Sequence, residues 1–223
     1  MKFDAIIFDF DGVLLESEYA GNRHLADYLT AFGHPIDAAE AMDRFMGLSG
    51  EQFLGAVERF IGRPLPPDFH TARTEESARA LREGLEEVAG ARAFIRALPP
   101  AFPRAIASSS STAWITAHLA HLGIAGQFGE HIYSGREHVT RGKPAPDLYL
   151  HAAERLGVAI ERTMILEDSP VGVTGAVASG AHVIGLCAGL HCPADHGESL
   201  RALGVHDVAA DFAEVAELVA RES

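Results

Sequence analysis

The sequence predicts an α/β protein with a parallel sheet and one inserted group of helices. Three observations support this fold class. Short apolar runs of strand length recur along the chain, helical patterns separate them, and residues 18–90 show helical patterning alone. A length of 223 residues leaves room for one large domain or for a domain that carries a smaller insertion.

The predicted strands are continuously apolar, as expected of parallel strands that are buried on both faces. The first strand, residues 5–8, ends at Asp9, and the others follow at residues 105–107, 164–166 and 183–186. Each run is followed by polar residues. Ligands of open parallel sheets bind beyond the carboxyl ends of the strands, so these polar residues are the candidates for a functional site.

Helices are predicted between the strands. Residues 114–122 keep apolar side chains on one face and end at Gly123, and residues 148–156 do the same before Gly157. Alternation of strands with such helices is typical of a parallel sheet.

The insertion has helical periodicity and no convincing buried strand. Apolar residues recur at helical spacing three times in it, first at Leu25 and Leu29. We therefore predict a core domain formed by residues 1–17 and 91–223, and a helical cap domain, residues 18–90, inserted after the first strand.

Charge and hydropathy exclude several classes of function. The chain has 18 Lys and Arg against 31 Asp and Glu, a net charge of −13, so it lacks the basic surface that binding to nucleic acid or an anionic membrane requires. No apolar stretch approaches the ~20 residues of a membrane helix, and the N-terminal residues lack the plan of a secretory signal. We expect a cytoplasmic protein with no nucleic-acid or membrane partner.

The two cysteines, Cys187 and Cys192, are too few for a disulfide framework. Their separation does not match the close pairing of many zinc sites. His191 and His196 flank Cys192, and we interpret these four residues as loop side chains without an assigned role.

Asp9 and Asp11 follow the first predicted strand. Residues two apart in an extended chain project to the same side, so the two carboxylates can share one site. One can act as a nucleophile and the other as acid and then base, with a hard dication relieving their repulsion. The alternative is a solvated acidic turn in which Gly12 supplies backbone freedom.

Three further strand ends or loops carry suitable residues. Ser108 opens a serine cluster where a hydroxyl and helix amides can hold a phosphate, although helix capping, expected of Ser111, is the alternative. Lys143 precedes a helix and can face a phosphate, or it can be a solvated loop lysine. Glu167 and Asp168 can ligate a metal, or they can interact with a helix dipole. The joint occurrence of these residues favours a phosphoryl-transfer site over separate structural roles.

These segments together resemble the four signature motifs of the haloacid dehalogenase superfamily. The resemblance covers nearly the whole core, and its motifs are Asp9-Phe10-Asp11-Gly12-Val13-Leu14, Ser108, Gly142-Lys143-Pro144-Ala145-Pro146-Asp147 and Glu167-Asp168-Ser169. The insertion is similar to the cap of the branch that contains beta-phosphoglucomutase and many small-molecule phosphatases. The resemblance implies a Rossmann-like core with a mobile helical cap.

The resemblance also implies a magnesium-dependent phosphatase with an aspartyl-phosphate intermediate. Asp9 would be the nucleophile and Asp11 the acid and base. Magnesium would be held by the Asp9 carboxylate, the Asp11 backbone carbonyl, Glu167 and Asp168. The phosphoryl group would be bound by Ser108, Ser109 and Lys143. The metal and the lysine would offset the local negative charge.

Departures from the family pattern bear on the activity. Asp11 argues against dehalogenation, and the cap has no lysine for phosphonoacetaldehyde hydrolysis. A beta-phosphoglucomutase-like mutase is the alternative, but Gly21 stands where those enzymes carry a cap histidine, and Met46-Gly47-Leu48-Ser49-Gly50 lacks their arginine. A phosphoaccepting signalling module is a further alternative, which Asp11 disfavours. Glu16 stands where most relatives have aspartate.

The expected partner is a phosphorylated small molecule, such as a sugar phosphate, by analogy with the family. Generic cap candidates for its recognition are Asn22, Arg23, Ser49 and Gln52. The sequence does not indicate an oligomeric state.

Overall fold

The computed structural model describes residues 3–46, 48 and 50–221. The chain forms two compact units. The sheet unit comprises Met1–Glu16 and Glu86–Ser223, and the helical unit comprises Ser17–Leu85. The division into domains at residues 18 and 90 stays a prediction.

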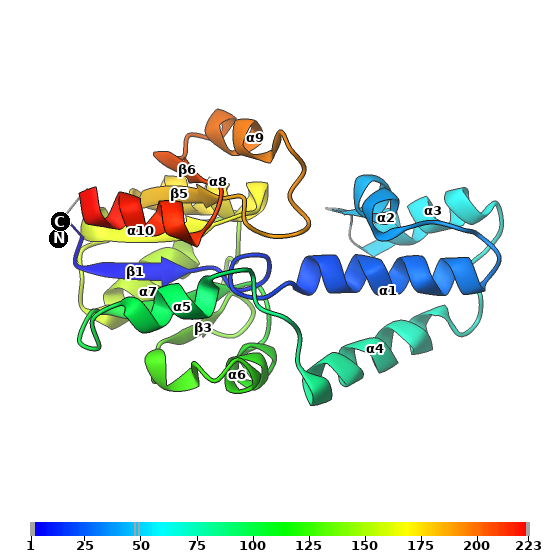
Figure 1. The fold of residues 1–223 in the computed structure, drawn as a ribbon, viewed down its shortest axis with the longest axis horizontal. Helices are drawn as coiled ribbons and strands as arrows, with labels where there is room; N and C mark the ends of the chain where they lie inside the picture. The colour runs from blue at the N-terminus through cyan, green and yellow to red at the C-terminus, as the bar shows by residue number, and fades with distance from the viewer. Residues whose placement is uncertain (1–2, 47, 49, 222–223) are drawn as a thin grey trace. The chain divides into compact units, whose positions relative to one another are not determined.

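The described residues of the sheet unit form a six-stranded sheet in the order β3-β2-β1-β4-β5-β6, with all neighbouring strands parallel. The strands are β1 (Ala5–Phe8), β2 (Arg104–Ser108), β3 (Ile132–Ser134), β4 (Thr163–Glu167), β5 (His182–Leu186) and β6 (Asp207–Ala209). This arrangement confirms the predicted α/β class with a Rossmann-like parallel sheet and an inserted group of helices (Figure 1).

Helices connect these strands, and one more helix follows the last of them. In the sheet unit they are α5 (Ala91–Ala97), α6 (Thr112–His121), α7 (Asp147–Leu156), α8 (Pro170–Ser179), α9 (His196–Ala202) and α10 (Phe212–Arg221), with 3-10 turns η1 (Ala125–Gln127) and η2 (Ile160–Arg162). The predicted helix ends before Gly123 and Gly157 are confirmed, and Gly157 has a φ of 73° at the end of α7. None of the helices that the structure describes combines the length and the apolar character needed to cross a bilayer.

Both faces of the sheet are covered. Ile7 of β1 lies in a buried cluster with Tyr149 of α7, whereas Phe8 packs its ring against Phe94 of α5 with the centroids 6.2 Å apart. Since successive strand residues point to opposite faces, α7 and α5 cover opposite faces of the sheet. This burial explains why the predicted runs are continuously apolar.

The register brings the polar strand ends together. Phe8 of β1 pairs with Ile106 of β2 on one side and with Leu166 of β4 on the other. Because the three strands are parallel, their carboxyl ends lie on the same side of the sheet. Asp9 and Glu167 occupy neighbouring places at these ends.

The four apolar runs coincide with β1, β2, β4 and β5. The remaining strands, β3 and β6, were not predicted. Each has three residues at an outer edge of the sheet, and each includes a polar residue, Ser134 or Asp207. Such short strands contain too few apolar residues to stand out from a loop.

The helical unit contains α1 (Ser17–Ala31), α2 (Ala38–Phe45), α3 (Gly50–Ile61) and α4 (Phe69–Glu83). Its own buried cluster includes Leu25 and Leu29 of α1, which the periodicity predicted, together with Phe45, Val57 and Phe69. Among the residues that the structure describes in this unit, helices, turns and loops occur and no strand does, as the sequence predicts.

Candidate active site

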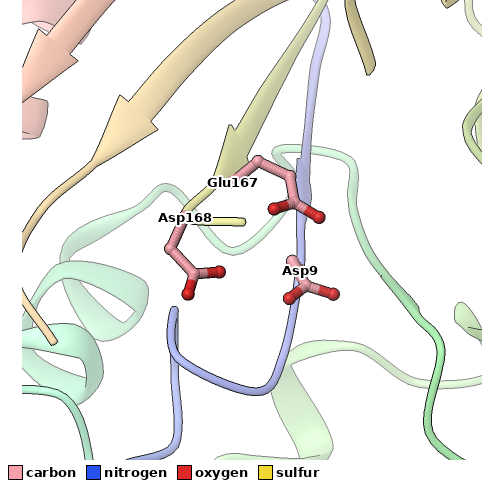
Figure 2. A group of neighbouring side chains, drawn as sticks. All are labelled: Asp9, Glu167 and Asp168. Carbon is pink, nitrogen blue, oxygen red and sulfur yellow. The ribbon is translucent and has the colours of Figure 1, made fainter. Parts of the chain in front are cut away.

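Three acids gather at the ends of β1 and β4, as Figure 2 shows. Asp9, Glu167 and Asp168 each place a carboxylate oxygen within 4.8 Å of the others. Their exposed fractions are only 6%, 0% and 3%. Buried like charges are costly without compensation, and a set of carboxylate oxygens is the donor set that a hard dication prefers. These three residues fit a magnesium ion.

Lys143 supplies a positive charge inside this group. Its side chain is 4% exposed, and its Nζ lies 2.6 Å from Asp9 Oδ1 and 2.6 Å from Glu167 Oε1. Burial alone would lower the pKa of Lys143, but the charges of Asp9 and Glu167 outweigh it and raise that pKa well above its usual range. The ammonium therefore stays charged between the two carboxylates.

For Asp9, burial has a larger effect on the pKa than the charge of Lys143 does. Burial raises its pKa well above its usual value, Lys143 opposes the shift, and the neighbouring Glu167 and Asp168 add to it. A bound dication would favour the ionised form that a nucleophile requires.

Both oxygens of Glu167 are held in place. The Tyr149 hydroxyl donates to Oε1 over 2.8 Å, and the backbone N–H and hydroxyl of Ser169 donate to Oε2 over 2.9 and 3.0 Å. Ser169 also caps α8 by accepting from Gly172 N, and Pro170 begins that helix, as predicted. Tyr149 was not predicted as a site residue, because an aromatic residue on an apolar helix face is indistinguishable from a core residue.

The side chain of Asp11 points to a different set of partners. Its carboxylate accepts from the Ser110 hydroxyl over 2.6 Å and from Trp114 Nε1 over 3.1 Å, and Ser108 Oγ lies 3.4 Å away. The alternation rule applies to extended chain, but β1 ends at Phe8, so the spacing of two does not bring Asp11 into the described acidic group.

The serines at the end of β2 and after it have different roles. Ser108 is buried and its Oγ accepts from Ser110 N over 3.0 Å, whereas Ser109 is exposed. Ser111 caps α6 by accepting from Trp114 N, as predicted. Ser110, which was not among the predicted site residues, forms the shortest of the hydrogen bonds described to Asp11.

The loop after β5 contacts Asp168. His191 Nε2 lies 2.8 Å from Asp168 Oδ2, and His196 Nε2 lies 2.6 Å from the Asp168 carbonyl oxygen. Cys192 Sγ is 3.6 Å from His191 Nε2. Burial, together with the charge of Asp168, raises the pKa of Cys192 to about 12, so its thiol stays protonated at neutral pH. None of these residues had a predicted role, and His196, interpreted from the sequence as a loop residue, is the first residue of α9.

The cap candidates are spread over the helical unit. Asn22 lines a cavity of about 230 Å³ inside this unit, together with Glu18 and Arg73, whose Nη1 donates to the Gly21 carbonyl over 2.9 Å. The other predicted cap residues differ in their surroundings. Arg23 and Gln52 are exposed outside that lining, and Ser49 lies outside the described residues.

Known proteins resemble this chain over most of its length. The model of a family described as haloacid dehalogenase-like hydrolase matches residues 3–180. Hexitol phosphatase A of Escherichia coli K12 is 32% identical, with 87% of this chain and 86% of that protein covered. The 6-phosphogluconate phosphatase of the same strain is 28% identical, with 85% of each covered.

A solved structure is similar at the level of the whole chain. It is a hydrolase of the same family from Deinococcus radiodurans R1 with bound phosphate and sodium. It superposes with a TM-score of 0.89 at 34% identity, and the match covers 99% of this chain and 96% of that one.

Proposed function

Because the chain belongs to the haloacid dehalogenase-like hydrolase family, we propose that it is a magnesium-dependent phosphatase that hydrolyses a phosphorylated small metabolite. The observation that carries this proposal is the position of Asp9. It is a buried carboxylate directly after the carboxyl end of β1, beside two further acids and a buried lysine. That set supplies a nucleophile, a metal site and a cation for the phosphoryl group.

Magnesium would be held by the carboxylates of Asp9, Glu167 and Asp168 and by the backbone carbonyl of Asp11. The ion supplies positive charge that offsets the charge of the phosphoryl oxygens. The convergence of three buried carboxylates supports this assignment, because oxygen ligands suit a hard dication.

In the first step a carboxylate oxygen of Asp9 attacks the phosphorus atom. The bond from phosphorus to the ester oxygen breaks, and its electron pair goes to that oxygen. Asp11, in its protonated form, gives the leaving oxygen a proton. The products of this step are a free alcohol and a phosphoryl group on Asp9.

In the second step Asp11, now a carboxylate, takes a proton from water. The water oxygen attacks phosphorus, the bond to Asp9 breaks, and inorganic phosphate leaves. Asp9 regains its carboxylate and Asp11 its proton, so the cycle closes. Lys143, Ser108 and Ser109 would hold the phosphoryl oxygens through both steps.

We propose a sugar phosphate or a related polyol phosphate as the substrate. The names of two similar proteins, a hexitol phosphatase and a 6-phosphogluconate phosphatase, support this class. The cap residues Asn22, Arg23, Ser49 and Gln52 remain proposed contacts. The cytoplasm remains the proposed location.

A beta-phosphoglucomutase-like reaction is the second candidate, since it would use the same Asp9 chemistry with a sugar hydroxyl as acceptor. Gly21 disfavours it, because this position carries no histidine and its carbonyl instead accepts from Arg73. A signalling module is disfavoured by Asp11, whose acid and base role would discharge the phosphoaspartate.

The test is a screen for phosphate release from a panel of phosphorylated metabolites with Mg²⁺, run beside Asp9→Asn. We expect release by the wild type and none by the variant. Asp43→Asn is the matched control, because Asp43 is an exposed carboxylate of α2. Release that survives in Asp9→Asn would contradict the mechanism. Conversion of a hexose 1-phosphate into its isomer, with a bisphosphate activator present, would favour the mutase.

A further inference from the structure

The loop between β5 and α9 brings a buried histidine onto one of the three acids. His191 is 5% exposed, and its Nε2 lies 2.8 Å from Asp168 Oδ2. We propose that His191 is a positioning residue, which fixes the Asp168 carboxylate and thereby tightens the binding of the divalent cation. This inference rests on the metal site of the proposed function.

The direction of the hydrogen bonds follows from the acceptors. An ionised carboxylate and a carbonyl oxygen only accept, so the Nε2 atoms of His191 and His196 both carry hydrogen and donate. One imidazole holds the side chain of Asp168, and the other holds its backbone carbonyl. Asp168 is therefore oriented at two points, by the loop between β5 and α9 and by the first residue of α9.

Two glycines make room for this contact. A Cβ at Gly12 would lie 2.2 Å from Asp168 Oδ2 and 2.9 Å from His191 Cε1. A Cβ at Gly189 would lie 2.4 Å from His191 Cε1. Any side chain at either position would push the imidazole away from the carboxylate, so the absence of Cβ at both positions permits the pair.

Glu16 anchors the same loop. Both of its carboxylate oxygens lie 3.1 Å from the backbone nitrogen of Leu190, which immediately precedes His191. Aspartate is one methylene shorter and could not reach this nitrogen from the same backbone position. Glu16, which stands where most relatives have aspartate, thus holds the loop that carries His191.

A fixed carboxylate binds a metal more tightly than a mobile one, because it loses less freedom when the ion arrives. Removal of such an outer partner typically weakens metal binding by about 10-fold to 100-fold. A histidine that only filled space would affect thermal stability and leave the affinity for the metal unchanged.

The experiment measures the dissociation constant of Mg²⁺ for the substrate-free full chain by titration calorimetry. We expect His191→Leu to raise this constant by about 10-fold to 100-fold. His191→Gln, whose amide nitrogen can stand in for Nε2, should stay within about threefold of the wild type, because it keeps a donor for the carboxylate.

The control is His182→Leu. His182 Nε2 also lies 3.0 Å from a carboxylate oxygen, that of Asp207, but this pair belongs to β5 and β6 and includes none of the three acids. We expect its Mg²⁺ dissociation constant to equal that of the wild type, whatever its effect on the melting temperature.

An unchanged dissociation constant in folded His191→Leu would overturn the inference while leaving the proposed function intact. If that variant does not fold, Glu16→Asp decides. It should weaken Mg²⁺ binding by shifting the loop, and an unchanged constant would overturn the inference. Absence of Mg²⁺ binding by the wild type would overturn the proposed metal site and this inference together.

Discussion

Asp11 shows how a single residue depends on partners from a distant element. Its carboxylate accepts a hydrogen bond from the indole of Trp114, the third residue of α6. The indole ring in turn packs on His118, with ring centroids 4.2 Å apart. These contacts give the proposed acid and base a defined orientation.

Trp114→Phe should reduce kcat by about 10-fold to 100-fold, because the indole donates to Asp11 when it is the carboxylate that takes a proton from water, and a hydrogen bond to a charged group contributes about 1.5–3 kcal/mol. Phenylalanine keeps an aromatic ring against His118 while removing the N–H donor. Steady-state kinetics on a sugar phosphate tests this. The Mg²⁺ dissociation constant, measured in parallel, should not change, because Asp11 contributes only its backbone carbonyl to the proposed metal site. An unchanged kcat would show that the indole does not orient Asp11.

At the scale of elements, β4 and α8 together shape the position of Glu167. Glu167 is the last residue of β4. Helix α8 begins at Pro170, directly after the capping residue Ser169. The third residue of the helix is Gly172, and a Cβ there would lie 1.7 Å from Glu167 Oε1. The helix therefore has a glycine where the carboxylate passes its backbone.

Gly172→Ala should displace Glu167 from Lys143 and Tyr149. We expect the free energy of unfolding to fall by about 1–3 kcal/mol, as in other overpacked interiors, and Mg²⁺ binding to weaken. Urea denaturation and titration calorimetry measure the two effects. The control is Gly126→Ala, because a Cβ at Gly126 would meet no heavy atom within 4 Å. If Gly172→Ala and Gly126→Ala had the same free energy of unfolding and the same Mg²⁺ affinity, a side chain at position 172 would not displace Glu167.

At the scale of the whole molecule, a chain of net charge −13 buries three carboxylates around one lysine. The pKa of Asp9 is raised in the folded protein above its usual value of 3.8, chiefly by burial. The folded state therefore holds this proton more tightly than the unfolded chain. The resulting stabilisation is present below pH 3.8 and is lost as the pH rises through the folded pKa.

In EDTA at neutral pH, Asp9→Asn should therefore melt at a higher temperature than the wild type, because it removes one buried negative charge. Lys143 keeps its partner Glu167 in the variant. The difference should shrink as the pH approaches 3.8. Circular dichroism melts at several pH values measure it, and Asp43→Asn is the control for the loss of an exposed charge. A lower melting temperature of Asp9→Asn than of the wild type at neutral pH would contradict the expected direction of this difference.

With Mg²⁺ present, the wild type should instead melt at a higher temperature than Asp9→Asn. An ion that binds only the folded state at 100 times its dissociation constant stabilises it by about 2.7 kcal/mol, and the wild type should gain more than Asp9→Asn, which lacks one ligand. Equal gains would argue against Asp9 as a ligand.

Much of the fold could be read from the sequence because burial on both faces leaves a simple pattern. Four strands were recognisable as apolar runs, whereas β3 and β6 are too short and too polar to be distinguished from loops. Helix ends were recognisable at Ser111, Gly157 and Ser169, because capping depends on residues that are adjacent in sequence.

The sequence by itself therefore determined the fold class and the set of chemical groups at the sheet edge, Asp9 and Glu167 among them. Only the tertiary structure decided the partners of these groups. It turned Asp11 toward Trp114, set Lys143 between two acids and placed His191 on Asp168. Periodicity encodes local backbone geometry and burial, whereas the partner of a loop side chain depends on the path of that loop across the folded sheet.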